Sequence, residues 1–151
     1  MGYRIEEKYR LTRGEQAYLK KKLFDNGLST LYPSRSINSC YFDTNDLRTF
    51  FDSDEGSLPR KKIRFRWYEN DNVLSEEVKI SSVEGRYKTI KKFNDGGFSK
   101  TYEKIIYDQM YGLLKPSLLI KYLREYYILN NLRITFDKNI TYTDLRGLTK
   151  K

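Results

Sequence analysis

Apolar and polar residues alternate along several segments of the chain, and this pattern predicts most of its strands. Between residues 60 and 69, charged or polar side chains alternate with Ile63, Phe65 and Trp67, which places the two groups on opposite faces of one strand. Residues 73–81 alternate in the same way after a polar turn, so the two segments are expected to form a hairpin. Further strands are predicted over residues 3–11, 37–42 and 86–92, and a second hairpin joins residues 117–128 to 132–137.

Other segments have the spacing of apolar residues that is typical of helices. Thr12 and Glu15 have the spacing of a capping box and an apolar stripe follows them, so a first helix is expected over about residues 13–26. A second long helix is predicted over residues 99–114, and a brief helix is expected after Asp43. The chain therefore predicts an α+β fold with six or seven mainly antiparallel strands and two main helices.

The composition indicates a folded, basic chain. Among 151 residues, 29 Lys and Arg stand against 20 Asp and Glu, a net charge of 29 − 20 = +9, and 38% of the residues are hydrophobic, enough to bury a core. The chain has no histidine, which excludes His-dependent acid–base catalysis, Ser-His-Asp triads and imidazole metal sites. A single cysteine, Cys40, and the lack of a long apolar run or signal-peptide pattern lead us to expect a cytoplasmic location.

Charged side chains recur on one face of most of the predicted strands. In one strand such alternation is ordinary, because a half-buried strand normally has one face in water. Two cations about 4 Å apart repel each other by about 4 kcal/mol at an effective dielectric constant near 20, so a face that gathers them is expected to bind an anion or abundant water. The expected groups are Arg4/Glu6/Lys8, Lys62/Arg64/Arg66, Glu77/Lys79, Arg86/Lys88, Tyr122/Arg124 and Arg133/Thr135/Asp137.

The residue types of these faces favour phosphate as the anion. A guanidinium can donate two hydrogen bonds to one phosphate group, and carboxylates among the cations are suited to a divalent ion bound with polyphosphate. Local pairing of each carboxylate with a neighbouring Lys or Arg is the alternative. The 14 tyrosines could stack on single-stranded nucleic acid, but most aromatic residues occupy core-facing positions, so nucleic-acid binding is disfavoured.

Six short motifs follow one another along nearly the whole chain: Arg4-x-Glu6-x-Lys8-Tyr9, Ser39-Cys40-Tyr41-Phe42-Asp43-Thr44, Lys62-x-Arg64-x-Arg66-x-Tyr68, Glu77-x-Lys79, Tyr122-x-Arg124 and Arg133-x-Thr135-x-Asp137. This succession resembles the VTC (vacuolar transporter chaperone) domain, a branch of the CYTH-like triphosphate tunnel metalloenzymes. The resemblance implies a single domain over residues 1–151, built as a closed antiparallel β-barrel lined by Lys and Arg. The family's final Glu-x-Lys strand has no match before Lys151, so a truncated domain with an open barrel is also expected.

The resemblance also implies which residues carry the function. Matching positions give seven phosphate-binding residues, of which the first four are the expected catalytic ones: Lys8, Arg64, Arg66, Lys79, Lys88, Arg124 and Arg133. Glu6 and Glu77 are the expected ligands of Mg²⁺ or Mn²⁺. VTC domains make polyphosphate from ATP, so the implied partners are ATP or another nucleoside triphosphate and inorganic polyphosphate.

Two other functions stay open at this point. Arg4 stands where the wider superfamily usually has a first Glu, which favours the polymerase-like branch over a metal-dependent triphosphate hydrolase. A non-catalytic module that binds polyphosphate or inositol phosphates is the third possibility, and the unmatched final strand favours it.

Overall fold

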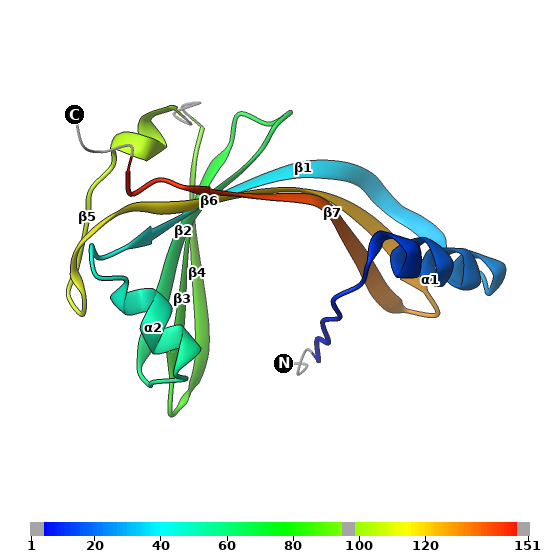
Figure 1. Ribbon diagram of the computed structural model, residues 1–151, viewed down its shortest axis with the longest axis horizontal. Coiled ribbons are helices and arrows are strands. Elements are labelled where there is room, and N and C mark those ends of the chain that lie inside the picture. The colour runs from blue at the N-terminus through cyan, green and yellow to red at the C-terminus, as the bar shows by residue number, and fades with distance from the viewer. Residues whose placement is uncertain (1–4, 95–98, 148–151) are drawn as a thin grey trace. The chain divides into compact units, whose positions relative to one another are not determined.

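The computed structural model describes residues 5–94 and 99–147 of the chain. Two α-helices, one short 3₁₀ helix and seven strands follow one another in these residues (Figure 1). Their order is α1 (Arg13–Asp25), β1 (Ser29–Asp43), α2 (Arg48–Asp54), β2 (Arg60–Tyr68), β3 (Leu74–Ser82), β4 (Gly85–Phe93), η1 (Ser99–Glu103), β5 (Ile106–Asp108), β6 (Gly112–Leu129) and β7 (Leu132–Asp144).

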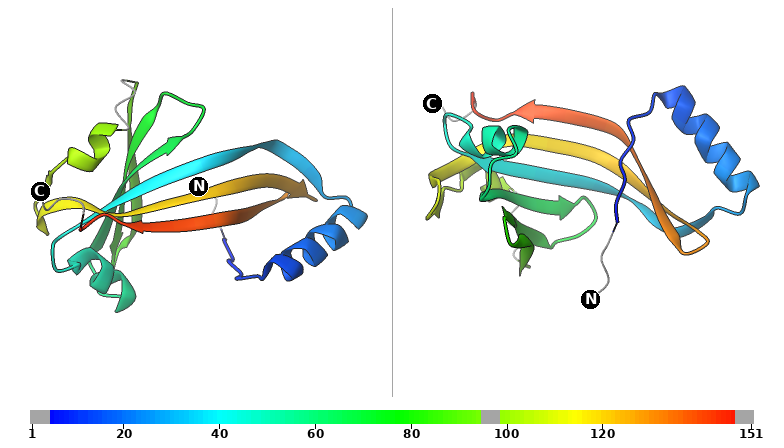
Figure 2. Two further views of the ribbon diagram at one scale, coloured as in Figure 1. Left: turned by 45° about the horizontal axis from the view of Figure 1, so that its top comes forward. Right: turned by 90° about the horizontal axis from the view of Figure 1, so that it is seen from below.

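The seven strands form one antiparallel sheet, which confirms the predicted α+β class. Their order is β4-β3-β2-β1-β6-β5, and β7 also pairs with β6. Strands β2, β3 and β4 lie side by side as two successive hairpins (Figures 1 and 2). Within the described residues β4 and β5 are the ends of this order, so the sheet is open and the expected closed barrel is wrong for this part of the chain.

The chain divides into two compact units, each with its own apolar core. Unit 1 contains residues 1–34 and 125–136, and its core is formed by Leu28, Tyr127 and Phe136. Unit 2 contains residues 35–124 and 137–151. The larger core belongs to unit 2 and is formed by Cys40, Phe42, Ile63, Phe65, Trp67, Leu74, Tyr111, Leu114 and Leu145.

Helix α1 of unit 1 has the predicted N-terminus. The Thr12 side chain accepts a hydrogen bond from the backbone N–H of Glu15, and the Glu15 carboxylate accepts one from the N–H of Thr12. This capping box satisfies two N–H groups that the first turn would otherwise leave without a partner. The Lys20 ammonium pairs with Glu125 and lies 5.2 Å from the centre of the Tyr127 ring, so it joins the helix to the core of unit 1.

The hairpins and the brief helix of unit 2 also follow the prediction. Residues of β2 pair with β3 over Arg60–Arg66, and the predicted strand 86–92 lies within β4. Asp43 at the end of β1 accepts hydrogen bonds from the backbone N–H groups of Thr49 and Phe50, at 2.9 and 3.1 Å. The Asp43 side chain therefore fixes the start of α2 against the end of β1.

The expected N-terminal strand is wrong for the residues that the structure describes. Residues 5–12 have no regular secondary structure, and residues 1–4 of the predicted strand lie outside the described residues. Ile5 and Tyr9 are 88% and 75% exposed, so the apolar side of the alternating pattern covers no core here. Alternation alone does not make a strand, because a strand also needs a neighbour that pairs with its backbone.

The expected helix over residues 99–114 is also wrong. The segment forms η1, the short strand β5, a tight turn and the start of β6. The Asp108 carboxylate accepts hydrogen bonds from the N–H groups of Met110 and Tyr111, and Gly112 takes a positive φ of 78°. A turn that begins with Asp and is followed by glycine favours a chain reversal over a helix. The apolar residues at helical spacing are therefore distributed over η1, β5, the turn and β6.

Candidate functional site

Strand register places many of the expected charged side chains on one face of unit 2. Arg64 of β2 lies opposite Tyr41 of β1 and opposite Glu77 of β3. Lys79 of β3 lies opposite Lys88 of β4. Residues directly opposite each other on neighbouring strands point to the same face of a sheet, so these side chains share one surface.

The centre of this surface is an ion pair between Arg64 and Glu77. The Arg64 Nε donates to Glu77 Oε2 at 2.6 Å, and its Nη1 donates to the Tyr41 hydroxyl at 3.0 Å. The Lys88 ammonium lies 3.5 Å from the same Glu77 oxygen, and the Glu77 side chain is only 7% exposed. Burial raises the pKa of Glu77, but the attraction of Arg64, with smaller contributions from Arg66 and Lys88, outweighs it and holds that pKa below its usual range.

A second cluster contains Arg66 and Arg124. The Arg66 guanidinium donates to the Ser39 hydroxyl and to the Tyr122 hydroxyl, both at 3.2 Å. The Arg124 guanidinium lies 5.2 Å from the centre of the Tyr122 ring and donates two hydrogen bonds to Asp137, at 2.7 and 2.8 Å. Tyr122 therefore contacts both arginines, one through its hydroxyl and one through its ring.

Burial and these arginines act in opposite directions on Tyr122. Burial raises the pKa of its hydroxyl, while the positive charges of Arg66 and Arg124 work against that rise. The balance keeps the pKa above its ordinary value of 10.0, so the hydroxyl is neutral at physiological pH. A neutral hydroxyl can accept the Arg66 hydrogen bond without cancelling the charge of the arginine.

We call this surface the ionic face. It is formed by Ser39 and Tyr41 (β1), Lys62, Arg64 and Arg66 (β2), Glu77 and Lys79 (β3), Arg86, Lys88 and Lys92 (β4), Tyr122 and Arg124 (β6) and Asp137 (β7). Its eight cations and two carboxylates give 8 − 2 = +6. Both carboxylates pair with an arginine, so the remaining positive charge favours the binding of an anion.

The structure brings together six of the nine expected site residues. Arg64, Arg66, Glu77, Lys79, Lys88 and Arg124 all belong to the ionic face of unit 2. The other three belong to unit 1: Arg133 lies on β7, while Glu6 and Lys8 precede α1 as an exposed pair with 3.7 Å between their charged groups.

Three side chains that hold the arginines were not among the expected site residues. Ser39, Tyr41 and Tyr122 supply the hydroxyls that accept hydrogen bonds from Arg64 and Arg66. Ser39 and Tyr41 occupy alternate positions of a predicted strand, which is the signal that could have found them. Using that signal requires the register between β1 and β2, which the sequence pattern alone does not give.

The described residues do not build a metal site of their own. They contain no group of three or more Asp, Glu or Cys side chains close enough to hold a metal ion. Glu77 already accepts from Arg64 and lies beside Lys88, and Glu6 belongs to unit 1. A divalent ion at the ionic face would therefore take most of its oxygen ligands from a bound phosphate chain or from water.

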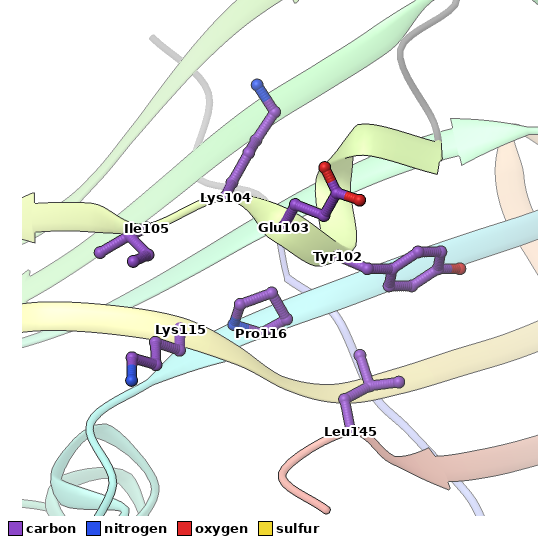
Figure 3. Close-up of a pocket in the computed structure, with 7 residues that line it drawn as sticks. All are labelled: Tyr102, Glu103, Lys104, Ile105, Lys115, Pro116 and Leu145. Atoms are coloured by element: carbon purple, nitrogen blue, oxygen red, sulfur yellow. The ribbon is translucent and has the colours of Figure 1, made fainter. Parts of the chain in front are cut away.

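A pocket of about 440 Å³ lies elsewhere in unit 2 (Figure 3). Tyr102 lines it and packs against Trp67, which alternates with Arg66 along β2 and so points away from the ionic face. The other lining residues come from the segment before β5, from β6 and from the residue that follows β7: Glu103, Lys104, Ile105, Lys115, Pro116 and Leu145. This pocket is mixed in character and contains none of the expected phosphate-binding residues.

Comparison with models of known families identifies the family of this chain. The VTC domain model matches residues 3–150, nearly the whole chain. The chain belongs to the VTC domain family. The VTC domain is a CYTH-like triphosphate tunnel domain, so its ligands are expected to be triphosphates.

A solved structure resembles this VTC domain in fold. The crystal structure of a "putative adenylate cyclase" from Bacillus halodurans matches with a TM-score of 0.50 and 12% sequence identity, over 85% of this chain and 76% of that chain. At that identity the likeness shows the fold alone. A comparison with curated proteins gave no significant match. Within the described part of the VTC domain, no helix is both long and apolar enough to cross a bilayer.

Proposed function

We propose that this VTC domain binds the triphosphate of a nucleoside triphosphate, or the end of a polyphosphate chain, on the ionic face and transfers the γ-phosphoryl group to a growing polyphosphate. The observation that supports this most is the gathering of Arg64, Arg66, Lys88 and Arg124 on one face of unit 2. Membership of the VTC domain family supports a triphosphate as the ligand.

The hydrogen bonds of the ionic face suit it to phosphate. Arg66 donates to two neutral hydroxyls, which fix its position and leave further N–H donors for phosphate oxygens. Arg64 is held between Tyr41 and Glu77, and its side chain is only 14% exposed. Groups held in place before the ligand binds lose little conformational freedom when it does.

The proposed reaction needs no protein nucleophile. The acceptor is a phosphate oxygen at the end of the polyphosphate chain, and the new P–O bond forms as the bond to the leaving nucleoside diphosphate breaks. Lys and Arg side chains of the ionic face would orient the two reactants and stabilise negative charge on the transferred group. This chemistry is compatible with a chain that has no histidine.

The proposed ligand is the Mg²⁺ or Mn²⁺ complex of the triphosphate. A divalent ion supplies neutralisation of phosphate charge, and Glu77 is the carboxylate of the ionic face nearest to Arg64 and Lys88 that could help to hold it. We expect the phosphate oxygens to provide most of the ligands, since the described residues contain no group of carboxylates built for a metal.

A non-catalytic binding module is the second candidate. The open sheet of the described residues and their lack of a protein-built metal site favour it. Such a module would bind polyphosphate or inositol phosphates without a divalent ion and without turnover.

Product analysis distinguishes these functions. The chain is incubated with ATP and Mn²⁺, and the products are separated on a polyacrylamide gel beside those of Arg66→Ala and of Lys121→Ala, a cation on the same strand as Tyr122 but on the other face. Polymer made by the parent and Lys121→Ala chains, and lost in Arg66→Ala, supports the proposal. Inorganic phosphate without polymer indicates a hydrolase, and unchanged ATP with retained binding indicates a binding module.

A further inference from the structure

Strand β4 is an edge of the sheet and is strongly basic. Among the described residues β4 pairs only with β3, and residues 86–92 are all exposed. The strand from Gly85 to Phe93 contains four cations and no carboxylate: Arg86, Lys88, Lys91 and Lys92. An edge strand offers a row of backbone N–H and C=O groups that a further strand can use.

The β3–β4 turn fixes which residues of β4 offer these groups. Ser82 pairs with Gly85 across a two-residue turn. The two residues that flank such a turn exchange backbone hydrogen bonds with each other. The register continues without interruption to Leu74 and Phe93, so the odd-numbered residues of β4 bond to β3. The even-numbered residues therefore direct their N–H and C=O groups away from the sheet, and these are Arg86, Lys88, Ile90 and Lys92.

The outward backbone groups and the positive side chains of β4 therefore occur at the same positions of the strand. Three of the four residues with outward backbone groups are cations, and their side chains all belong to the ionic-face side of the strand. A second copy of this strand would fit poorly, because antiparallel pairing of two β4 strands would place cations opposite cations. A partner strand with carboxylates at alternate positions would place them opposite Arg86, Lys88 and Lys92.

We propose that the free edge of β4 binds an acidic, extended peptide segment of a partner protein as an additional antiparallel strand. Backbone hydrogen bonds to residues 86, 88, 90 and 92 supply the binding, and alternate acidic residues supply the specificity. Read from its N-terminus, the partner places Glu opposite Lys92, an apolar residue opposite Ile90, and Glu opposite Lys88 and Arg86. Lysines that merely protect an edge from aggregation would give no such selectivity.

The test uses a labelled peptide, Glu-Thr-Val-Thr-Glu-Thr-Glu, and measures its binding to the whole chain by fluorescence anisotropy. Two further peptides are the controls: one with Gln in place of each Glu, and one of the same composition with the three Glu residues adjacent. We expect both controls to bind about tenfold more weakly, since three opposite-charge pairs are lost or misplaced. Equal binding of the adjacent-Glu peptide would overturn the proposal, because it would show a surface that attracts any polyanion.

Proline at position 90 tests the backbone part of the proposal. Ile90→Pro removes an outward N–H without removing a bond to β3, and Ile90→Ala is the matched control that keeps this N–H. We expect only the proline variant to lose binding of the peptide. Circular dichroism checks that both variants are folded. If that variant does not fold, a peptide N-methylated at the amides that face β4 replaces it. Unchanged affinity of that peptide for the wild-type chain would contradict strand addition.

Discussion

Arg64 and Glu77 lie directly opposite each other on β2 and β3, and the Arg64 Nε donates to Glu77 Oε2 at 2.6 Å. Both side chains are largely buried, with 14% and 7% of their surface exposed. The pair contributes to the fold because it neutralises a buried carboxylate, and it contributes to the proposed site because it fixes the position of a guanidinium. These two roles can be separated by experiment.

Removal of Arg64 is expected to destabilise the fold. Arg64→Ala leaves Glu77 with the more distant Lys88 ammonium, at 3.5 Å, so we expect the free energy of unfolding to fall by about 2–3 kcal/mol. Urea unfolding at neutral pH measures this change. In the double variant Arg64→Ala/Glu77→Gln the carboxylate is gone, and part of the loss should return. A loss of the same size in the double variant would show that the pair does not act as a unit.

The pH dependence of stability provides an independent test of Glu77. Arg64 and Lys88 hold its pKa below the ordinary value of 4.5, so its contribution to stability is present above that value and disappears as the pH falls through the lower pKa of the folded state. Wild-type protein should therefore lose more stability between about pH 7 and about pH 3.5 than Glu77→Gln does. Urea unfolding at the two pH values checks this, with the exposed Glu84→Gln as the control. A Glu84→Gln effect as large as that of Glu77→Gln would contradict the account.

Tyr122 is expected to act as a positioning residue. Tyr122→Phe removes the hydroxyl that accepts from Arg66 and keeps the ring beside Arg124. We expect binding of tripolyphosphate to weaken by about three- to tenfold, the effect of one ordinary hydrogen bond, while thermal stability changes little. Isothermal titration calorimetry measures the affinity. The affinities of wild-type protein and Tyr122→Phe are compared at one fixed ionic strength. Equal affinities of the two proteins would show that the hydroxyl does not orient Arg66.

Cys40 is expected to be inert in the folded protein. Its side chain lies in the core with none of its surface exposed, and burial raises the pKa of the thiol to about 12. Since the thiolate is the reactive form, alkylation by iodoacetamide should be about 1,000-fold slower than for a free cysteine near pH 8. Mass spectrometry follows the reaction with and without urea. Rapid labelling without urea would show that the core of unit 2 is not packed as described.

The sequence predicts most of unit 2 because its elements carry local signals. Alternation in residues 60–69 and 73–81 gives the β2–β3 hairpin, and Asp43 marks the start of the brief helix. The segment 99–114 was predicted wrongly because the turn at Asp108 depends on hydrogen bonds that apolar spacing does not reveal. The hydrogen bonds by which three hydroxyls hold the arginines were not predicted for a related reason: they depend on strand register, which is a tertiary property.

The site itself was predicted in part. The family resemblance and the charge pattern give the cations of β2, β3, β4 and β6, which the structure brings to one face. The same reasoning assigns Lys8 and Glu6 to a strand, but the described residues around them form no strand. Binding of phosphate by any of the expected residues, including those that the structure brings to one face, stays a prediction.

The most direct test of the central claim is a comparison of two single-cation variants by isothermal titration calorimetry with tripolyphosphate. Arg66→Ala removes a guanidinium from the ionic face, and Lys121→Ala removes one charge from the other face of β6. Charge-assisted hydrogen bonds are worth about 1.5–3 kcal/mol, so we predict that Arg66→Ala weakens binding by about ten- to 150-fold. Lys121→Ala should change it by less than about twofold. Equal effects of the two variants, or no effect of either, would contradict a phosphate site on the ionic face.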